Sequence, residues 1–314
     1  MSGLSDLADL AGPHPEWFQA ALAVPRKEHV VPCDGGTLHG FSWGDPQKPA
    51  VLFTHGMLAH ARCWAFVAPL LAEHFHLAAY DISGMGDSSW HESYNYEQRA
   101  AEALVFANAL EMERPQLVCH SFGGSVGLSA TQHYPDAFSS LIVCDMTMLR
   151  PEDVAEFEKS HEENPGFARV RSTNKVYERL ETALARYRLA PEQPCANDFL
   201  LEYMAYHSLK KVEGGYVWKF DPRILSPDRM KDTDWWASLS TRFAALAMPK
   251  AIVHGALSDL FTPQVAQYMR ELTEHRVPIV GIEHAHHHVM LDQPIALAAT
   301  LSALLQSLPG DAAV

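Results

Sequence analysis

Short apolar runs recur along the chain, and segments with a helical pattern separate them. The runs are Ala50–Thr54, Leu77–Ile82, Gln116–His120, Leu141–Asp145, Ala251–His254 and Pro278–Ile282. Most do not alternate between apolar and polar residues, which is typical of strands covered on both faces. Strands that alternate with helices predict an α/β fold with a doubly wound, mostly parallel sheet flanked by helices.

Apolar residues in the intervening segments recur with the period of an amphipathic helix. These segments are Trp64–Leu71, Ala100–Ala107, Val265–Leu272 and Leu297–Leu308. Thr262 and Pro263 provide an N-cap and a first helical residue for the third of them. Before the first run, residues 28–45 form a predicted hairpin, whose turn is Asp34-Gly35-Gly36.

One interval breaks this alternation. Residues 149–248 show helical stretches at Glu152–Lys159 and Lys175–Tyr187, and a hairpin turn at Gly214-Gly215. A stretch of roughly 100 residues is too long for a single loop in a compact domain. We therefore predict a core over 1–148 and 249–314, and a mostly helical unit inserted between two of its strands over 149–248.

The overall composition excludes several classes of protein. The chain has 314 residues, 47% of them hydrophobic, and a formal net charge of -14. This charge predicts no nucleic-acid partner and no polybasic contact with a membrane. The N-terminus lacks a basic and apolar signal segment, and the five cysteines do not suggest a disulfide framework. We expect a cytoplasmic protein whose partner is a small-molecule substrate.

The clearest chemical signal is a serine at the end of an apolar strand. Ser121 follows Gln116–His120, and small residues and a helix-like stretch follow it. This is the pattern of a nucleophile elbow, in which a tight strand-to-helix turn presents the serine oxygen. Gly123 provides the small residue two positions later, while Cys119 stands two positions earlier, where glycine is usual. Ser121 is therefore the predicted nucleophile.

A serine nucleophile that attacks a carbonyl needs two donors for the oxyanion that forms. The first candidate is the backbone N–H of Phe122, directly after the nucleophile. The second is the N–H of Met57, which follows His55-Gly56 at the end of an earlier strand. We predict Met57 and Phe122 as the oxyanion hole.

Two aspartates compete for the role of the acid that orients a catalytic histidine. Asp259 follows the strand Ala251–His254, and Asp145 ends the strand Leu141–Asp145. Functional groups collect at the carboxyl ends of parallel strands, so both positions qualify. We predict Asp259 as the catalytic acid and Asp145 as the rival.

Four histidines compete for the role of base. They are His284, His286, His287 and His288, in a loop before the final helix, and periodicity does not distinguish them. A histidine-rich tract can also bind metal, as in a metal-dependent hydrolase. No carboxylate or cysteine stands at a supporting spacing, so we predict no metal and no cofactor.

Together these motifs resemble the α/β-hydrolase fold family. The resemblance covers 28–308, and it places the catalytic base on His287, because that family has a histidine shortly before an acidic residue and a proline. The order Ser121, Asp259, His287 matches that of the family. The loop from Asp81 to Ser88 is similar to the family's D-x-x-G-x-G-x-S loop, in which Gly84 and Gly86 are structural. The resemblance implies that 1–148 and 249–314 form a hydrolase core and that the inserted unit over 149–248 is a helical cap over its active site. Aromatic residues of this cap, above all Tyr203, Trp218 and Trp235, are then the expected substrate contacts.

The predicted activity is hydrolysis of a carboxylic ester through an acyl-enzyme on Ser121. The same triad could serve C–C bond hydrolysis of ring-cleavage products, lactone opening, thioester hydrolysis or perhydrolysis. A non-catalytic binding module is a further alternative, although it would be expected to have a broken triad.

Overall fold

The computed structural model describes residues 14–156, 159, 174–225 and 233–308. Its main sheet has eight strands in the order β1-β2-β4-β3-β5-β6-β9-β10. Their bounds are Arg26–Cys33, Gly36–Trp43, His76–Tyr80, Ala50–Thr54, Gln116–His120, Ser140–Cys144, Lys250–Gly255 and Ile279–Ile282, in that spatial order. The hairpin β1–β2 is antiparallel and pairs antiparallel with β4, and every neighbouring pair from β4 to β10 is parallel. The predicted mostly parallel sheet is thus confirmed.

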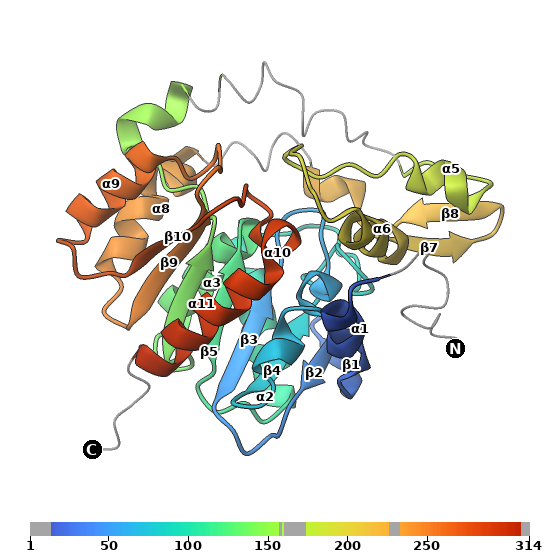
Figure 1. The fold of residues 1–314 in the computed structure, drawn as a ribbon, viewed down its shortest axis with the longest axis horizontal. Helices are drawn as coiled ribbons and strands as arrows, with labels where there is room; N and C mark the ends of the chain where they lie inside the picture. The colour runs from blue at the N-terminus through green and yellow to red at the C-terminus, as the bar shows by residue number, and fades with distance from the viewer. Residues whose placement is uncertain (1–13, 157–158, 160–173, 226–232, 309–314) are drawn as a thin grey trace.

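Helices cover both faces of this sheet (Figure 1). They are α1 (Glu16–Ala23), α2 (Tyr96–Ala109), α3 (Phe122–His133), α8 (Thr233–Ala245), α9 (Pro263–Leu272), α10 (Val289–Asp292) and α11 (Pro294–Ser307). Side chains of one strand divide between two apolar clusters. Leu117 and Cys119 of β5 join the cluster under α2 and α3, and Val118 joins the cluster under α11. A strand buried on both faces explains the continuous apolar runs.

The predicted helix over Trp64–Leu71 is not a single helix. Two short 3-10 helices, η1 (Ala61–Trp64) and η2 (Ala68–Leu71), take its place. Pro69 explains the break, because proline has no backbone N–H to donate to the preceding turn and its ring clashes with that turn.

Between β6 and β9 the chain leaves the sheet. The described elements there are η3 (Pro151–Asp153), α5 (Leu180–Leu184), α6 (Asp198–His207), β7 (Leu209–Val212), β8 (Gly215–Trp218), η4 (Pro222–Leu225) and α8. The turn at Gly214 has a φ of 82° and joins the antiparallel β7–β8 pair, as predicted. Of the helix expected over 175–187 only α5 is helical. In the helix expected over 152–159, η3 forms the start, 154–156 are helical, and 157–158 lie outside the described residues.

This inserted segment has two parts with different surroundings. In Figure 1, α5, α6 and the β7–β8 hairpin are grouped on one side of the molecule, whereas α8 lies near α9 on the other. Leu239 and Phe243 of α8 are fully buried in the cluster that contains α3 and α9. The last helix of the predicted cap therefore flanks the sheet and contributes to the core.

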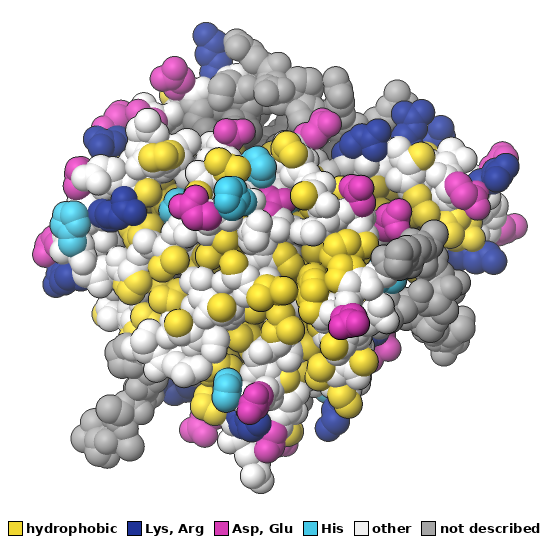
Figure 2. Space-filling model, in the orientation of Figure 1, with side chains coloured by type: hydrophobic (Ala, Val, Ile, Leu, Met, Phe, Trp, Pro, Cys, Tyr) yellow, Lys and Arg dark blue, Asp and Glu magenta, His cyan; other side chains and the backbone are white. Residues whose placement is uncertain are grey.

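The acidic side chains are scattered over the surface that Figure 2 shows. Figure 2 shows Asp and Glu side chains distributed over the visible face, with Lys and Arg among them, rather than in one patch. None of the described helices is both long and apolar enough to cross a bilayer.

Candidate active site

Ser121 occupies a strained turn between β5 and α3. Its φ is 51° and its ψ is -121°, a conformation that a residue with a side chain adopts only when its surroundings enforce it. The N–H of Ser121 donates to the carbonyl of Cys144 on the neighbouring strand, and the N–H of Gly124 donates to the Ser121 carbonyl. These bonds hold the serine at the carboxyl edge of the sheet, at the start of α3.

The turn is tight enough to require a glycine at 123. A Cβ at that position would lie 2.6 Å from the carbonyl oxygen of His55 and 2.6 Å from Oγ1 of Thr54. The cysteine at 119 is accommodated from the other side, because a Cβ on Gly127 would lie 2.5 Å from its Sγ. The departure from the usual glycine at 119 is therefore compensated by Gly127 on α3.

The loop that carries Met57 lies against the serine. A Cβ on Gly56 would come within 3.2 Å of the Cβ of Ser121, so the two backbones are in close approach. His55 fixes this loop, because its Nδ1 donates to the carbonyl of Gly56 and its Nε2 accepts from the N–H of Ile82. Met57 therefore lies in the loop that approaches Ser121, and Phe122 directly follows Ser121. These are the two residues predicted for the oxyanion hole.

A buried histidine–aspartate pair lies at the same sheet edge. Nδ1 of His287 donates to Oδ1 of Asp145 over 2.8 Å, and both side chains are almost inaccessible. The same carboxylate accepts the N–H of Gly255 over 2.8 Å and the hydroxyl of Ser258 over 2.7 Å. A donor at Nδ1 leaves Nε2 as the basic nitrogen of His287, the tautomer that a general base needs.

The predicted position of the acid is wrong. Asp259 is exposed, and Asp145, the rival aspartate, contacts His287 instead. The loop after β9 still takes part, because its residues Gly255 and Ser258 donate hydrogen bonds to Asp145. The spacing of Asp259 from the strand was suitable, but its neighbour Ser258 faces the site.

The other histidines of the tract have different surroundings. His284 is exposed and has a φ of 59°. His286 is paired through Nδ1 with Asp292, 3.1 Å away. The ring of His288 lies 4.9 Å from that of His287, centroid to centroid. Of the four, His287 is the histidine paired with an aspartate at a strand end, and it is the one on which the family resemblance places the base.

His120, directly before the nucleophile, completes a group of three imidazoles. Its Nε2 donates to the backbone carbonyl of His287 over 3.0 Å. Burial lowers the pKa of both His120 and His288 well below that of a free histidine, and the nearby His287 acts in the same direction. Both rings are therefore neutral at ordinary pH.

An apolar pocket opens beside the elbow. Its empty space, including the open mouth, is about 450 Å³. The lining residues are Met57, Leu58, Ala59, Cys63, His120, Tyr187, Arg188, Leu189, Ala190, Met204, His288, Met290 and Leu291. Most are aliphatic or methionine side chains, and those from 187 to 204 come from the inserted segment.

The three aromatic residues predicted to contact substrate do not line this pocket. Tyr203 is fully buried in the core, where its ring meets Phe18 and Phe66. Trp218 packs against other aromatic rings of the insertion, and Trp235 stacks on Tyr96 of α2. Met204, the neighbour of Tyr203 on α6, faces the pocket instead, and the sequence held no periodic signal to identify it.

The Asp81 loop has a structural role. Gly84 and Gly86 have φ values of 82° and 59°, as the resemblance implied. Oδ1 of Asp81 accepts the N–H of Ala61, and Oδ2 accepts the N–H of Asp87 and Nδ1 of His39. This buried carboxylate therefore organises the loops behind the site.

Comparison with known proteins identifies related sequences. A sequence model of the alpha/beta hydrolase family matches residues 51–300. A serine hydrolase-like protein of Danio rerio is 24% identical over 89% of this chain and 88% of its own length. Esterase Rv0045c of Mycobacterium tuberculosis is 25% identical over 98% of each chain.

Solved structures agree on the fold. The crystal structure of esterase Rv0045c covers 98% of this chain and all of its own, with a TM-score of 0.70 at 22% identity. That of E-2-(acetamidomethylene)succinate hydrolase covers 90% of this chain and all of its own, with a TM-score of 0.74 at 20% identity. Structural likeness at such low identity establishes the fold and leaves the substrate open.

Proposed function

The chain belongs to the alpha/beta hydrolase family, and on that premise we propose that it is a serine hydrolase that cleaves carboxylic esters through an acyl-enzyme on Ser121. The observation that carries the proposal is the joint presence, at one sheet edge, of a strained serine at the start of α3 and a histidine whose Nδ1 is held by a buried aspartate. This combination is the one that nucleophilic catalysis by serine requires.

In the proposed mechanism Nε2 of His287 takes the proton of the Ser121 hydroxyl as the oxygen attacks the ester carbonyl. Asp145 holds the imidazole by Nδ1 and stabilises the positive charge that it gains. The N–H groups of Met57 and Phe122 donate to the oxyanion of the tetrahedral intermediate. His287 then returns the proton to the leaving alkoxide, and a water activated by the same imidazole hydrolyses the acyl-enzyme.

The acyl group that stays on Ser121 would occupy the pocket beside the elbow. We expect this group to be apolar and unbranched or lightly branched. Met57, Met204 and Met290 contribute to its wall. Methionine side chains adapt to different shapes, so we expect a range of acyl chain lengths to be accepted. Among the described wall residues, aspartates and glutamates are absent and the one permanent charge is that of Arg188, which is exposed, so the aliphatic part of the wall favours a neutral acyl chain.

The test is a pre-steady-state assay with p-nitrophenyl esters of graded acyl length. The wild-type protein is expected to release a burst of nitrophenol stoichiometric with enzyme, together with an acyl mass adduct on the peptide that contains Ser121. Ser121→Ala is expected to lose the burst, the adduct and at least about 10⁴-fold of kcat, because the nucleophile is gone.

Ser125→Ala serves as the matched variant, since this serine lies one turn further along α3 and is buried. It is expected to retain the burst. Turnover that persists in Ser121→Ala, or an adduct on another residue, would contradict the proposal.

A further inference from the structure

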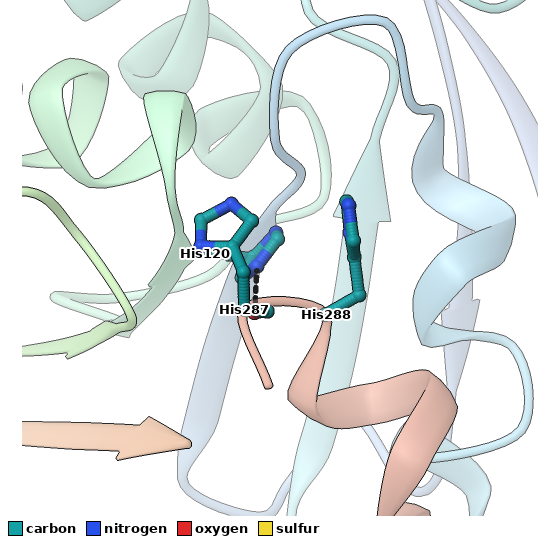
Figure 3. Close-up of side chains that lie close together, drawn as sticks. All are labelled: His120, His287 and His288. Atoms are coloured by element: carbon teal, nitrogen blue, oxygen red, sulfur yellow. Dashed lines mark hydrogen bonds between the residues drawn. The ribbon is translucent and has the colours of Figure 1, made fainter. Parts of the chain in front are cut away.

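Three imidazoles meet beside the proposed nucleophile, and they come from two distant parts of the chain. His120 ends β5, and His287 and His288 lie in the loop before α10 (Figure 3). One ring nitrogen from each lies within 4.8 Å of the other two. The ring centroids are 4.8 Å apart for His120 and His287, and 5.6 Å apart for His120 and His288.

Each ring has a nitrogen that remains available. Nε2 of His120 donates to the His287 carbonyl, so its Nδ1 carries the lone pair. Nδ1 of His287 donates to Asp145, so its Nε2 carries the lone pair. Nε2 of His288 is buried, and no hydrogen-bond partner reaches it from the part of the chain that the structure describes.

This arrangement is the one found around metal-binding histidines, which usually donate their second nitrogen to a carboxylate or a backbone carbonyl. We propose that His120, His287 and His288 form a binding site for one divalent transition-metal ion, with Zn²⁺ as the representative ligand. The donors would be Nδ1 of His120, Nε2 of His287 and Nε2 of His288, and the fourth position would be left to solvent.

The donor set selects the class of ion. Three neutral imidazoles suit Zn²⁺, Cu²⁺ or Ni²⁺, whereas Ca²⁺ and Mg²⁺ require oxygen ligands. Zinc–nitrogen distances of about 2.0–2.1 Å need the three nitrogens to lie roughly 3.3 Å apart. Rotations of the side chains that bring the nitrogens together by an ångström or so would meet that requirement.

The sequence alone predicted no metal because the third ligand of the proposed site is far away in the chain. Within the tract His284–His288, no further ligand stands at a supporting spacing. The third ligand, His120, is 167 positions away from His287 and reaches it only because β5 and the loop before α10 end at the same sheet edge.

Occupancy would have a direct consequence for the proposed reaction. A metal ion on Nε2 of His287 takes the lone pair that removes the proton of Ser121, so the bound ion would inhibit hydrolysis reversibly. This consequence rests on the proposed function, whereas the binding site itself does not.

The binding test uses chelator-treated full-length protein and Co²⁺, whose visible absorption reports nitrogen coordination, followed by Zn²⁺ titration by calorimetry. We expect one ion per chain and a tetrahedral Co²⁺ spectrum. His288→Ala and His120→Gln are each expected to weaken Zn²⁺ binding by at least about tenfold. His120→Gln keeps a donor for the His287 carbonyl and removes the ligand nitrogen.

His284→Ala is the matched variant, because this histidine belongs to the same tract and is exposed. It is expected to bind Zn²⁺ as the wild type does. Equal affinity in wild type, His288→Ala and His120→Gln, or an equal loss in His284→Ala, would overturn the site.

Inhibition is measured separately as the Zn²⁺ dependence of ester hydrolysis, each variant relative to its own metal-free rate. The wild type is expected to lose activity on Zn²⁺ addition and recover it with chelator, and His288→Ala to need at least about tenfold more Zn²⁺. Activation by Zn²⁺ would overturn the inhibitory role. A Co²⁺ spectrum without hydrolysis of any ester would count against the proposed esterase and leave the metal site standing.

Discussion

Two buried histidine–aspartate pairs of this protein have almost the same geometry and different surroundings. Nδ1 of His39 lies 2.9 Å from Asp81, and Nδ1 of His287 lies 2.8 Å from Asp145. The difference is at the second ring nitrogen. Nε2 of His39 is 2.7 Å from Glu28, so both nitrogens of this ring are occupied, whereas Asp145 leaves Nε2 of His287 available.

This comparison shows that a buried histidine–aspartate pair does not by itself identify a catalytic site. A ring held at both nitrogens joins loops together, and a ring held at one nitrogen can accept a proton or bind an ion. The carboxylates around His39 also favour its protonated form. Burial opposes the protonated form of His39, but the hydrogen bond and charge of Asp81, with a further bond to Glu28, raise its pKa to about 9.

The largest expected effect is on the His287 pair. Asp145→Asn should lower kcat/KM for ester hydrolysis by about 10⁴-fold, because an asparagine cannot hold the Nδ1–H tautomer or stabilise the imidazolium. Asp259→Asn, at the exposed aspartate of the neighbouring loop, should change kcat/KM by less than about threefold. Steady-state kinetics of the two variants side by side give the answer, and the reverse ranking would remove Asp145 from the site.

The next effect concerns the stability that the His39 pair provides. His39→Gln should lower the free energy of unfolding at pH 6 by about 2–3 kcal/mol, and leave kcat/KM of the folded protein within about threefold. The folded pKa of about 9 exceeds the unfolded value of about 6.5, so this stabilisation is complete below about pH 6.5 and is lost as the pH rises through about 9. Denaturant titrations of wild type and variant across that range should converge at high pH. A constant difference would mean that the charge of His39 is not involved.

The smallest effect refines the role of the loop after β9. Ser258→Ala removes one donor to Asp145 and should lower kcat/KM about tenfold with little change in KM, since this serine is buried and is not among the residues that line the pocket. Thr262→Ala, on the same connection, removes the N-cap bond to Val265 and should cost about 1 kcal/mol of stability without this loss of activity. Similar kinetics in both variants would show that support of Asp145 by Ser258 is unimportant.

Much of the fold could be predicted from the sequence, because both faces of the central strands are buried and their apolar runs are continuous. The run at 50–54 coincides with β3, and that at 116–120 coincides with β5. The failed helix at 64–71 has a local cause in Pro69, which the helical spacing of the apolar residues obscured.

The site was predictable where chemistry is local and not where it depends on contacts between strands. The turn at Ser121 is encoded within a few residues. Which aspartate contacts His287 depends on hydrogen bonds between segments that are distant in the sequence. Gly255 and Ser258, from the neighbouring strand and the loop after it, donate to Asp145 and hold its carboxylate in place. The pocket wall depends on how α6 packs, so the aromatic residues of the insertion do not identify it.

The most direct test of the central claim is the rate at which a fluorophosphonate labels Ser121, followed by intact mass and peptide mapping in wild type, Asp145→Asn, Asp259→Asn and His39→Gln. We predict a single adduct on the Ser121 peptide, labelling slowed by at least about 10³-fold in Asp145→Asn, and near wild-type rates in the other two. An adduct on a different residue, or a slow Asp259→Asn beside a fast Asp145→Asn, would contradict the account.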